Sequence, residues 1–457
     1  MLNLRESFQI YGKGDNPIYW LSTQHGLKTV KNDKSNLVFF DTKGPISSHV
    51  ARPIYESFEN IMEDLVHYAD QRMKQNRVDV SGRVALSLLG WCPDTPLKAA
   101  IEYFAVDWEL AEPADISSLD YATGTVDMVD GSYPAGNEFV IDERLNRPLP
   151  CFDSMTDVHL GRGFNFILRQ EAATFLLDDD PRLMLGSRIL DVFYNDHNVI
   201  VVTDNGHTIV ADYAICTFSL GVLQGNDVHF HPPFPEWKRE ALFSFHMTTY
   251  TKIFLKFDRK FWEDWQFAVY ASPKSETGSR YIVWQNLNAP GYLGELEHML
   301  MVTTTYKDSE RIEHMTDSDI QREIVQVLRN MFGQDIPEPS AILVPRWHSN
   351  PLFRGSYSNW PIGAFEKHHQ NLRAPLGEVP RLWFAGEATS EQQYGFLHGA
   401  WLEGISVAEK VAGCIIHKCS VPSFDEYVTG CEDNFRFRRQ KPLNFYNQAQ
   451  KRSDFLS

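Results

Sequence analysis

The chain has 457 residues, more than one hydrophobic core usually supports, and 43% of them are hydrophobic, so two packed domains are expected. Its formal net charge of −17 argues against a nucleic-acid partner, whose phosphates favour a basic surface, and favours the approach of cationic ligands. Six cysteines without a CxxC pair suit neither a zinc site nor a disulfide framework, so no metal is expected and reduced, buried thiols are the default.

The first predicted element is an amphipathic helix over residues 52–78. Pro53 suits its first position, and a stripe of apolar residues at spacings of three and four follows: Ile54, Phe58, Ile61, Leu65 and Tyr68. A second helical stretch is predicted over 96–110. The segment 118–157 is rich in Asp, Gly and Pro and is predicted to be mostly loop.

From Arg182 onward the pattern is typical of strands. Three β-rich runs come first, at 188–194, 198–203 and 207–218, and Asp204-Asn205-Gly206 supplies the turn between the last two. A mixed sheet on the substrate side is predicted from four further runs, at 249–257, 266–272, 280–285 and 299–306. Asp317 or Ser318 is predicted to cap a helix over 320–333, which Gly333 ends.

The most informative segment is residues 381–414, RLWFAGEATSEQQYGFLHGAWLEGISVAEKVAGC. A short buried strand ends at Glu387, a polar turn follows, and a long helix with small residues on one face comes next. Such an acid can accept hydrogen bonds from ribityl hydroxyls, and such a helix amino terminus can face the N1–C2=O edge of a flavin ring, where negative charge gathers on reduction. A plain strand–turn–helix with glycines for close packing explains the pattern about equally well.

Together with four earlier segments, this stretch resembles the flavin-containing amine oxidases, above all the polyamine oxidases of plants and fungi. The earlier segments are 105–114, 216–224, 248–262 and 342–363, and the resemblance covers roughly residues 10–415. It implies an α/β fold in which an FAD-binding domain is interleaved with a substrate domain of mixed sheet and helices. The implied parts are a helical substrate part at 10–155, flavin parts at 160–225 and 380–415, and a substrate sheet at 226–379. A polar tail is predicted at 431–457.

The resemblance also implies roles for single residues. Lys252 matches the active-site lysine that holds a water near the flavin and can relay a proton. Tyr357 and Phe396 match two rings that sandwich the substrate amine, while Glu109 and Tyr250 match further cavity residues, with Glu109 able to pair a distal ammonium. The implied flavin contacts are Glu387 at the ribityl chain, Gly386, Thr389 and the backbone of Leu397 beside the flavin, Trp347 along the ring, and Ile189 at the adenine. Without the context of these motifs, the aromatic residues would be interpreted as core side chains and the charged residues as solvated surface side chains.

One part of the family's pattern is absent from the sequence. These enzymes begin with a strand, a G-x-G-x-x-G turn and a helix that hold the pyrophosphate and AMP half of FAD. The pairs Gly12/Gly14 and Gly161/Gly163 have neither the spacing nor the preceding strand. We therefore expect a chain that starts within the fold and, as written, binds FAD weakly or not at all. An incomplete gene model is the leading explanation; a separately supplied first part and a degenerate paralogue are the alternatives.

The implied activity is FAD-dependent oxidation of a polyamine of the spermine or spermidine type by O₂, giving an aldehyde, an amine and H₂O₂. One alternative is oxidation of a monoamine or an L-amino acid, for which Arg346 or Arg354 would bind the carboxylate. Another is a catalytically inactive protein that binds polyamines or partner proteins.

No apolar run is long enough to span a bilayer, and residues 1–9 lack the apolar stretch of a signal peptide. These features favour a cytoplasmic location. A secreted or peroxisomal location stays open if a targeting segment preceded residue 1.

Overall fold

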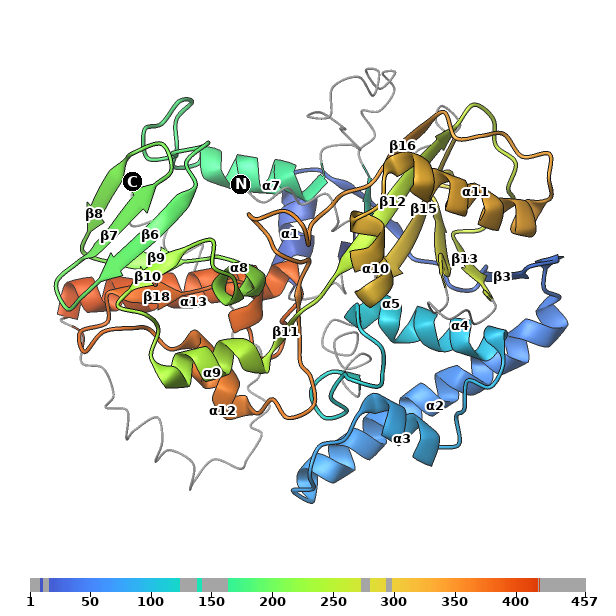
Figure 1. Ribbon diagram of the computed structural model, residues 1–457, viewed down its shortest axis with the longest axis horizontal. Helices are drawn as coiled ribbons and strands as arrows, with labels where there is room; N and C mark the ends of the chain where they lie inside the picture. Colours follow the sequence, from blue (N-terminus) through green and yellow to red (C-terminus); the bar gives the residue numbers. More distant parts are fainter. Residues whose placement is uncertain are drawn as a thin grey trace.

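The computed structural model describes residues 9–10, 16–123, 138–141, 163–272, 280–292, 298–417 and 419. A seven-stranded sheet with the order β16-β12-β15-β14-β13-β3-β4 forms the middle of one half (Figure 1). Its two long strands, β12 (Tyr250–Phe257) and β15 (His298–Thr305), pair antiparallel along their whole length. The shorter strands are β3 (Val38–Asp41), β4 (Gly44–Pro45), β13 (Phe267–Tyr270), β14 (Val283–Asn286) and β16 (Ala341–Leu343).

Different helices cover the two faces of this sheet. Because side chains alternate along a strand, Ile253 and Lys252 of β12 point to opposite faces. Ile253 belongs to the hydrophobic cluster that the sheet forms with helices α10 (Tyr306–Glu313) and α11 (Asp317–Phe332). Lys252 stands opposite Thr303 of β15, whose hydroxyl accepts a hydrogen bond from Trp108 of helix α5 (Asp107–Leu110) at 3.4 Å. Lys252 therefore faces the helical side on which α5 lies.

The other half contains a four-stranded sheet of order β10-β6-β7-β8 and a parallel pair, β9 with β18. The strands are β6 (Ile189–Tyr194), β7 (Val199–Thr203), β8 (Thr208–Ala211), β9 (Ala214–Cys216), β10 (His229–His231) and β18 (Leu382–Phe384). Trp383 of β18 packs against the long helix α13 (Leu397–His417), whereas Phe384 contacts the opposite layer, formed by α9 (Glu236–Ser244) and α12 (Glu366–Arg373). The pair β9–β18 is thus covered by helices on both faces.

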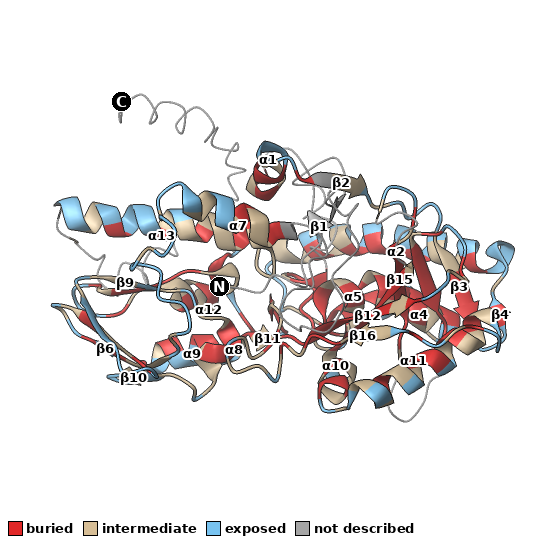
Figure 2. Cartoon of the chain, turned by 90° about the horizontal axis from the view of Figure 1, so that it is seen from above, coloured by how far each residue is buried: buried red, intermediate tan, exposed pale blue. Residues whose placement is uncertain are grey.

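The remaining described elements surround these sheets. They are α1 (Pro17–Gln24), α2 (Ser48–Lys74), α3 (Gly82–Leu88), α4 (Pro96–Ala105), α7 (Gly163–Ala173), α8 (Leu220–Gln224), β1 (Gln9–Ile10), β2 (Lys28–Lys31), β5 (Glu138–Ile141), β11 (His246–Met247) and β17 (Ser358–Asn359). Buried residues concentrate along β12, β15 and α5, whereas the outward side of α13 is largely exposed or intermediate (Figure 2). None of the described helices is both long and apolar enough to cross a bilayer.

The predicted strands are present within a few residues of their expected positions, and the turn at Gly206 joins β7 to β8 with a φ of 85°. Three details of the prediction were wrong. The run 207–218 is two strands in different sheets, because the chain leaves the first sheet after β8. The helix 96–110 breaks at Val106 into α4 and α5, and the cap of α11 is Thr316, whose side chain accepts from the backbone N–H of Asp319.

Helix α2 also starts earlier than predicted, at Ser48, so Pro53 lies inside it. Proline cannot donate to the carbonyl of His49, but both His49 and Pro53 are exposed residues in the first turns of α2, where the missing hydrogen bond costs least. In the segment predicted to be mostly loop, β5 forms a strand that pairs with β1 and β2. The tail at 431–457 and the glycines at 12, 14 and 161 lie outside the described residues, and the boundaries of the two interleaved regions stay a prediction.

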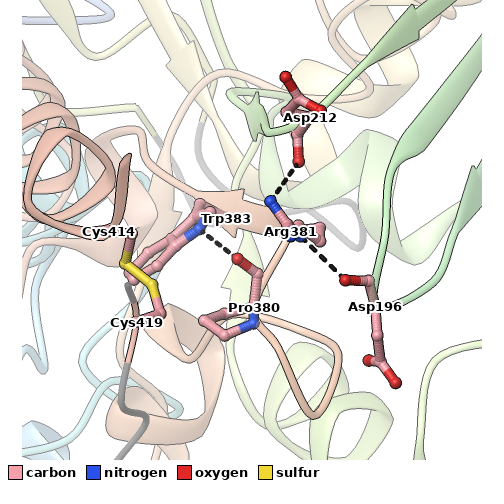
Figure 3. Close-up of a disulfide and its surroundings, with 7 residues drawn as sticks. All are labelled: Asp196, Asp212, Pro380, Arg381, Trp383, Cys414 and Cys419. Atoms are coloured by element: carbon pink, nitrogen blue, oxygen red, sulfur yellow. Dashed lines mark hydrogen bonds between the residues drawn. A yellow bond between two sulfur atoms is a disulfide. The ribbon is translucent and has the colours of Figure 1, made fainter. Parts of the chain in front are cut away.

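The expectation of reduced, buried cysteines was wrong for part of the chain. Cys414, near the end of α13, forms a disulfide with Cys419, and their Cα atoms are 4.3 Å apart. Both cysteines pack beside Trp383 of β18, whose indole N–H donates to the carbonyl of Pro380 at 3.1 Å (Figure 3). Cys92 is a free thiol but exposed. The two cysteines are five positions apart and form no CxxC pair, so the spacing did not indicate the disulfide.

Lys238 ties α9 to the carboxyl end of α12 from a fully buried position. Its Nζ donates to the carbonyls of Leu372 at 2.5 Å, Ala374 at 2.9 Å and Asn371 at 3.2 Å, and lies 3.6 Å from the Phe384 ring centroid. We expect Lys238→Met, which keeps the apolar stem, to lower the free energy of unfolding by about 2–4 kcal/mol, because buried acceptors lose their donor.

Urea unfolding of the variant and the wild type measures this effect. The control is Lys74→Met, at an exposed lysine on α2, which should change little. Equal unfolding midpoints for Lys238→Met and the wild type would show that the buried lysine does not hold α12.

Candidate active site

A cavity of about 460 Å³ lies between the two halves of the molecule. One side of its wall comes from α5 and β12, and the other from β18, the turn after it and the first turn of α13. The segment between β16 and β17 closes it further. The structure brings together around it all of the predicted site residues except Ile189: Glu109, Tyr250, Lys252, Trp347, Tyr357, Gly386, Glu387, Thr389, Phe396 and Leu397.

Ile189 does not line this cavity. It is the first residue of β6 and packs, half-buried, against the large hydrophobic cluster. Its predicted role was a backbone contact to an adenine, which would lie away from the flavin ring. That role stays a prediction.

Glu387 forms the polar end of the cavity. It follows β18 and Gly386, whose φ of 136° a residue with a side chain rarely adopts. Its carboxylate accepts from the hydroxyl of Ser358 at 2.7 Å and from the backbone N–H groups of Gly395 at 2.6 Å and Ser358 at 3.2 Å. Burial raises the pKa of Glu387, and these hydrogen bonds oppose that shift. The acid therefore links β17, the turn after β18 and the start of α13.

Lys252 lies in the wall on the opposite side, with only 6% of its surface exposed. Its Nζ is 5.5 Å from the ring centroid of Tyr250, whose ring is 5.7 Å from that of Tyr357. The hydroxyl of Tyr357 donates to the backbone carbonyl of Glu109 at 2.9 Å. A single chain of contacts thus joins the lysine, two aromatic rings and the end of α5 that carries the acid.

Phe396 stands just before α13 and stacks on the imidazole of His398, with centroids 5.2 Å apart and planes at 20°. His398 is buried, and burial lowers its pKa to about 4, so the ring is neutral near pH 7. Sequence reasoning did not single out His398, although it lies inside the motif 381–414. Trp108, Cys216 and Phe353 also line the cavity and were missed. Trp108 adjoins Glu109, and Cys216 belongs to one of the quoted motifs; these neighbours were the available signal.

Both arginines that could have bound a substrate carboxylate are engaged elsewhere. Arg346 donates to Asp317 at 2.6 Å, and Arg354 forms a two-pronged pair with Asp227 at 2.6 and 2.8 Å. Neither lines the cavity, and within the described part of the chain the lining contains no arginine at all. Lys252 supplies a positively charged side chain to the lining of the cavity.

The residues present fit the ring and ribityl part of a flavin. The partly buried carboxylate of Glu387 lines the cavity close to the first turn of α13, where the helix dipole places partial positive charge. The indole N–H of Trp347, another lining residue, has no partner within the described part of the chain. The described residues show no glycine-rich turn between a strand and a helix that would hold a pyrophosphate. Nor do they hold three or more His, Cys, Asp or Glu side chains arranged to bind a metal.

The fold and this cavity define a class of flavoenzyme. The model of the family described as flavin containing amine oxidoreductase matches residues 8–412. The chain therefore belongs to that family.

Among the similar proteins are two plant polyamine oxidases. Polyamine oxidase 6 of Oryza sativa subsp. japonica is 38% identical over 336 residues, and polyamine oxidase 1 of Zea mays is 37% identical over 336 residues. Each alignment covers 70% of this chain and 61% of the relative, so the chain spans about three fifths of their length. A solved putrescine oxidase bound to putrescine shares the fold, with a TM-score of 0.64, 15% identity, and coverage of 88% of this chain and 87% of that one.

A histidine paired with a buried acid near the cavity makes stability depend on pH. Glu112, 4% exposed, accepts from Asn359 of β17 at 2.7 Å and pairs with Nδ1 of His246 at 2.8 Å. The hydrogen bond to Glu112 raises the pKa of His246 above its usual 6.5. A raised folded-state pKa adds stability that is fully present below about 6.5 and is lost as pH rises through the raised value.

We expect His246→Gln to destabilise the protein more at pH 5 than at pH 9, by about 0.5–1 kcal/mol, a small value because the imidazole is partly solvated. Urea unfolding at both pH values measures the difference. His49→Gln, at an exposed histidine of α2, serves as the control and should show no such dependence. An equal loss at pH 5 and pH 9 for His246→Gln would contradict the pairing.

Proposed function

We propose that the protein oxidises amines with FAD as its cofactor, and that its substrates are polyamines. The observation that carries the proposal is the convergence of Lys252, Glu387, Tyr357 and Phe396 on one cavity in a chain of the amine oxidoreductase family. The chemistry that FAD supplies when bound is two-electron oxidation of a carbon–nitrogen bond, with O₂ as the final acceptor. The products are an aldehyde, an amine and H₂O₂.

The residues of the chain take three roles in this proposal. Glu387 and the first turn of α13 bind the ribityl chain and ring edge, and Trp347 lies along the ring. Tyr357 and Phe396 hold the amine between their faces, which attract an ammonium group and also accommodate a neutral amine. Lys252, buried in the wall, holds a water and moves a proton to or from it.

Three features favour a polyamine over other amines. Glu109 lines the cavity beside Tyr357 and can pair a second ammonium distant from the reacting one. The net charge of −17 raises the local concentration of polycations. Several relatives are themselves named polyamine oxidases. An L-amino acid is disfavoured because Arg346 and Arg354 are paired away from the cavity.

The test is an H₂O₂ assay with the chain in excess FAD. Spermine, spermidine and putrescine are compared with a monoamine, such as benzylamine, and with L-leucine. Spermine or spermidine should give the highest kcat/KM. Turnover of L-leucine alone would support the amino-acid alternative, and ligand binding without H₂O₂ from any amine would support an inactive binding protein.

A further inference from the structure

Residues 344–357, between β16 and β17, form the Trp347 loop, which contains neither helix nor strand. It contributes Trp347, Phe353 and Tyr357 to the cavity wall. Trp347 is only 9% exposed, and its ring meets that of Phe353 edge to face at 4.7 Å. A segment without its own ladder of hydrogen bonds needs outside partners to hold a side chain in one orientation.

A buried acid accepts hydrogen bonds from the backbone directly after Trp347. Glu313, the last residue of α10, is 6% exposed and does not line the cavity. Its two carboxylate oxygens accept from the next two backbone N–H groups after Trp347, those of His348 at 2.9 Å and Ser349 at 2.7 Å. Each oxygen thus serves one donor.

Arg346, which directly precedes Trp347, binds the same region of the structure. Its guanidinium donates to the side chain of Asp317 at 2.6 Å and to the carbonyls of Met315 at 3.0 Å and Glu313 at 3.3 Å. Trp347 is therefore flanked directly on both sides by contacts to the end of α10, the start of α11 and Met315 between them. The far end of the loop is fixed to the other half, where Arg354 pairs with Asp227.

A buried carboxylate is costly to take out of water, and it is stable only when donors replace the lost solvent. Two backbone N–H groups do so here, through charge-assisted bonds that are stronger than bonds between neutral groups. The geometry is directional because both donors belong to consecutive residues of one loop. Moving the backbone at His348 would rotate the indole and break both bonds.

We propose that Glu313 is a positioning residue of the active site, whose carboxylate fixes the backbone directly after Trp347 and so sets the orientation of the indole in the cavity wall. The importance of that orientation for turnover rests on the proposed function, whereas the anchoring of the loop by Glu313 does not depend on it. Glu313 touches neither substrate nor cofactor, and it acts through Trp347.

The experiment uses the full chain with Glu313→Gln, which keeps the size of the side chain but presents an NH₂ group to one of the two N–H donors. Hydrogen–deuterium exchange at the amides of His348 and Ser349 should become about tenfold faster or more, because each bond lost is charge-assisted. Acrylamide quenching of the Trp347 emission, obtained by subtracting Trp347→Phe spectra, should also increase. The matched control is Glu310→Gln on the same helix, whose carboxylate is not an acceptor for the loop.

The outcomes separate anchoring from general stability. Faster exchange confined to the Trp347 loop, with an unchanged urea midpoint, supports the proposal. Unchanged exchange at the two amides overturns it, as does uniformly faster exchange that includes α11. Glu313→Asp, which keeps the charge, should restore part of the protection, whereas a purely steric role predicts that it behaves worse than Gln.

In excess FAD, Glu313→Gln and Trp347→Phe should lower kcat by similar factors, and the double variant should be no worse than Trp347→Phe alone. Additive losses would contradict action through Trp347. If the wild type oxidises no amine, the proposed function fails, while the exchange measurement still decides whether Glu313 anchors the loop.

Discussion

The affinity of the purified 457-residue chain for FAD is expected to be several orders of magnitude lower than that of an enzyme that holds the pyrophosphate in a glycine-rich turn. Glu387 and the start of α13 can hold the ribityl chain and the ring edge, but the described residues offer no such turn to the two phosphate charges. Each missing charge-assisted hydrogen bond costs about 1.5–3 kcal/mol, and two or three of them account for this loss.

A comparison of FAD with riboflavin tests this prediction directly. Riboflavin carries the ring and ribityl chain without the phosphates, so FAD and riboflavin should bind with affinities within about tenfold of each other. Titration followed by flavin absorbance or calorimetry gives both constants, and Glu387→Gln should weaken both ligands alike. Stoichiometric FAD that survives gel filtration, while riboflavin is lost, would show that this chain does hold the pyrophosphate and AMP half of FAD.

The second large effect is expected at Lys252. Replacing it with methionine keeps the apolar stem in the wall but removes the group proposed to relay a proton, which should slow flavin reduction or reoxidation about 10²–10³-fold. Amine binding should change much less, because the rings of Tyr357 and Phe396 remain. Stopped-flow absorbance in excess FAD measures both half-reactions, and the amine dependence of the reductive rate gives the substrate Kd.

Lys256→Met is the matched control on the same strand. Lys256 belongs to β12 but does not line the cavity, so this variant should keep its rates. Similar losses in both variants would point to damage to the strand. A Lys252→Met variant that loses amine affinity but keeps its rates would assign Lys252 to binding and would refute the relay.

The strands and helices were predictable where local pattern is strong. The run 249–257 is rich in β-branched and aromatic residues, and β12 occupies residues 250–257. The ends of the helices were harder to predict, because they depend on exposure to solvent and on the elements that pack beside them. The exposed first turns of α2 tolerate Pro53 inside the helix, and nothing in the sequence near Val106 required the break between α4 and α5.

The family and the candidate flavin-binding acid could be predicted from the sequence, because strand 382–384, Glu387 and the helix after it form one continuous segment whose chemistry can be recognised locally. The three-dimensional packing alone sets the contacts that distant residues make around that segment. It placed Glu109 against Tyr357, paired Arg354 with Asp227 away from the cavity, and set Glu313 behind Trp347. These contacts join positions far apart in the chain, so they follow from how the two halves pack, and no spacing along the sequence encodes them.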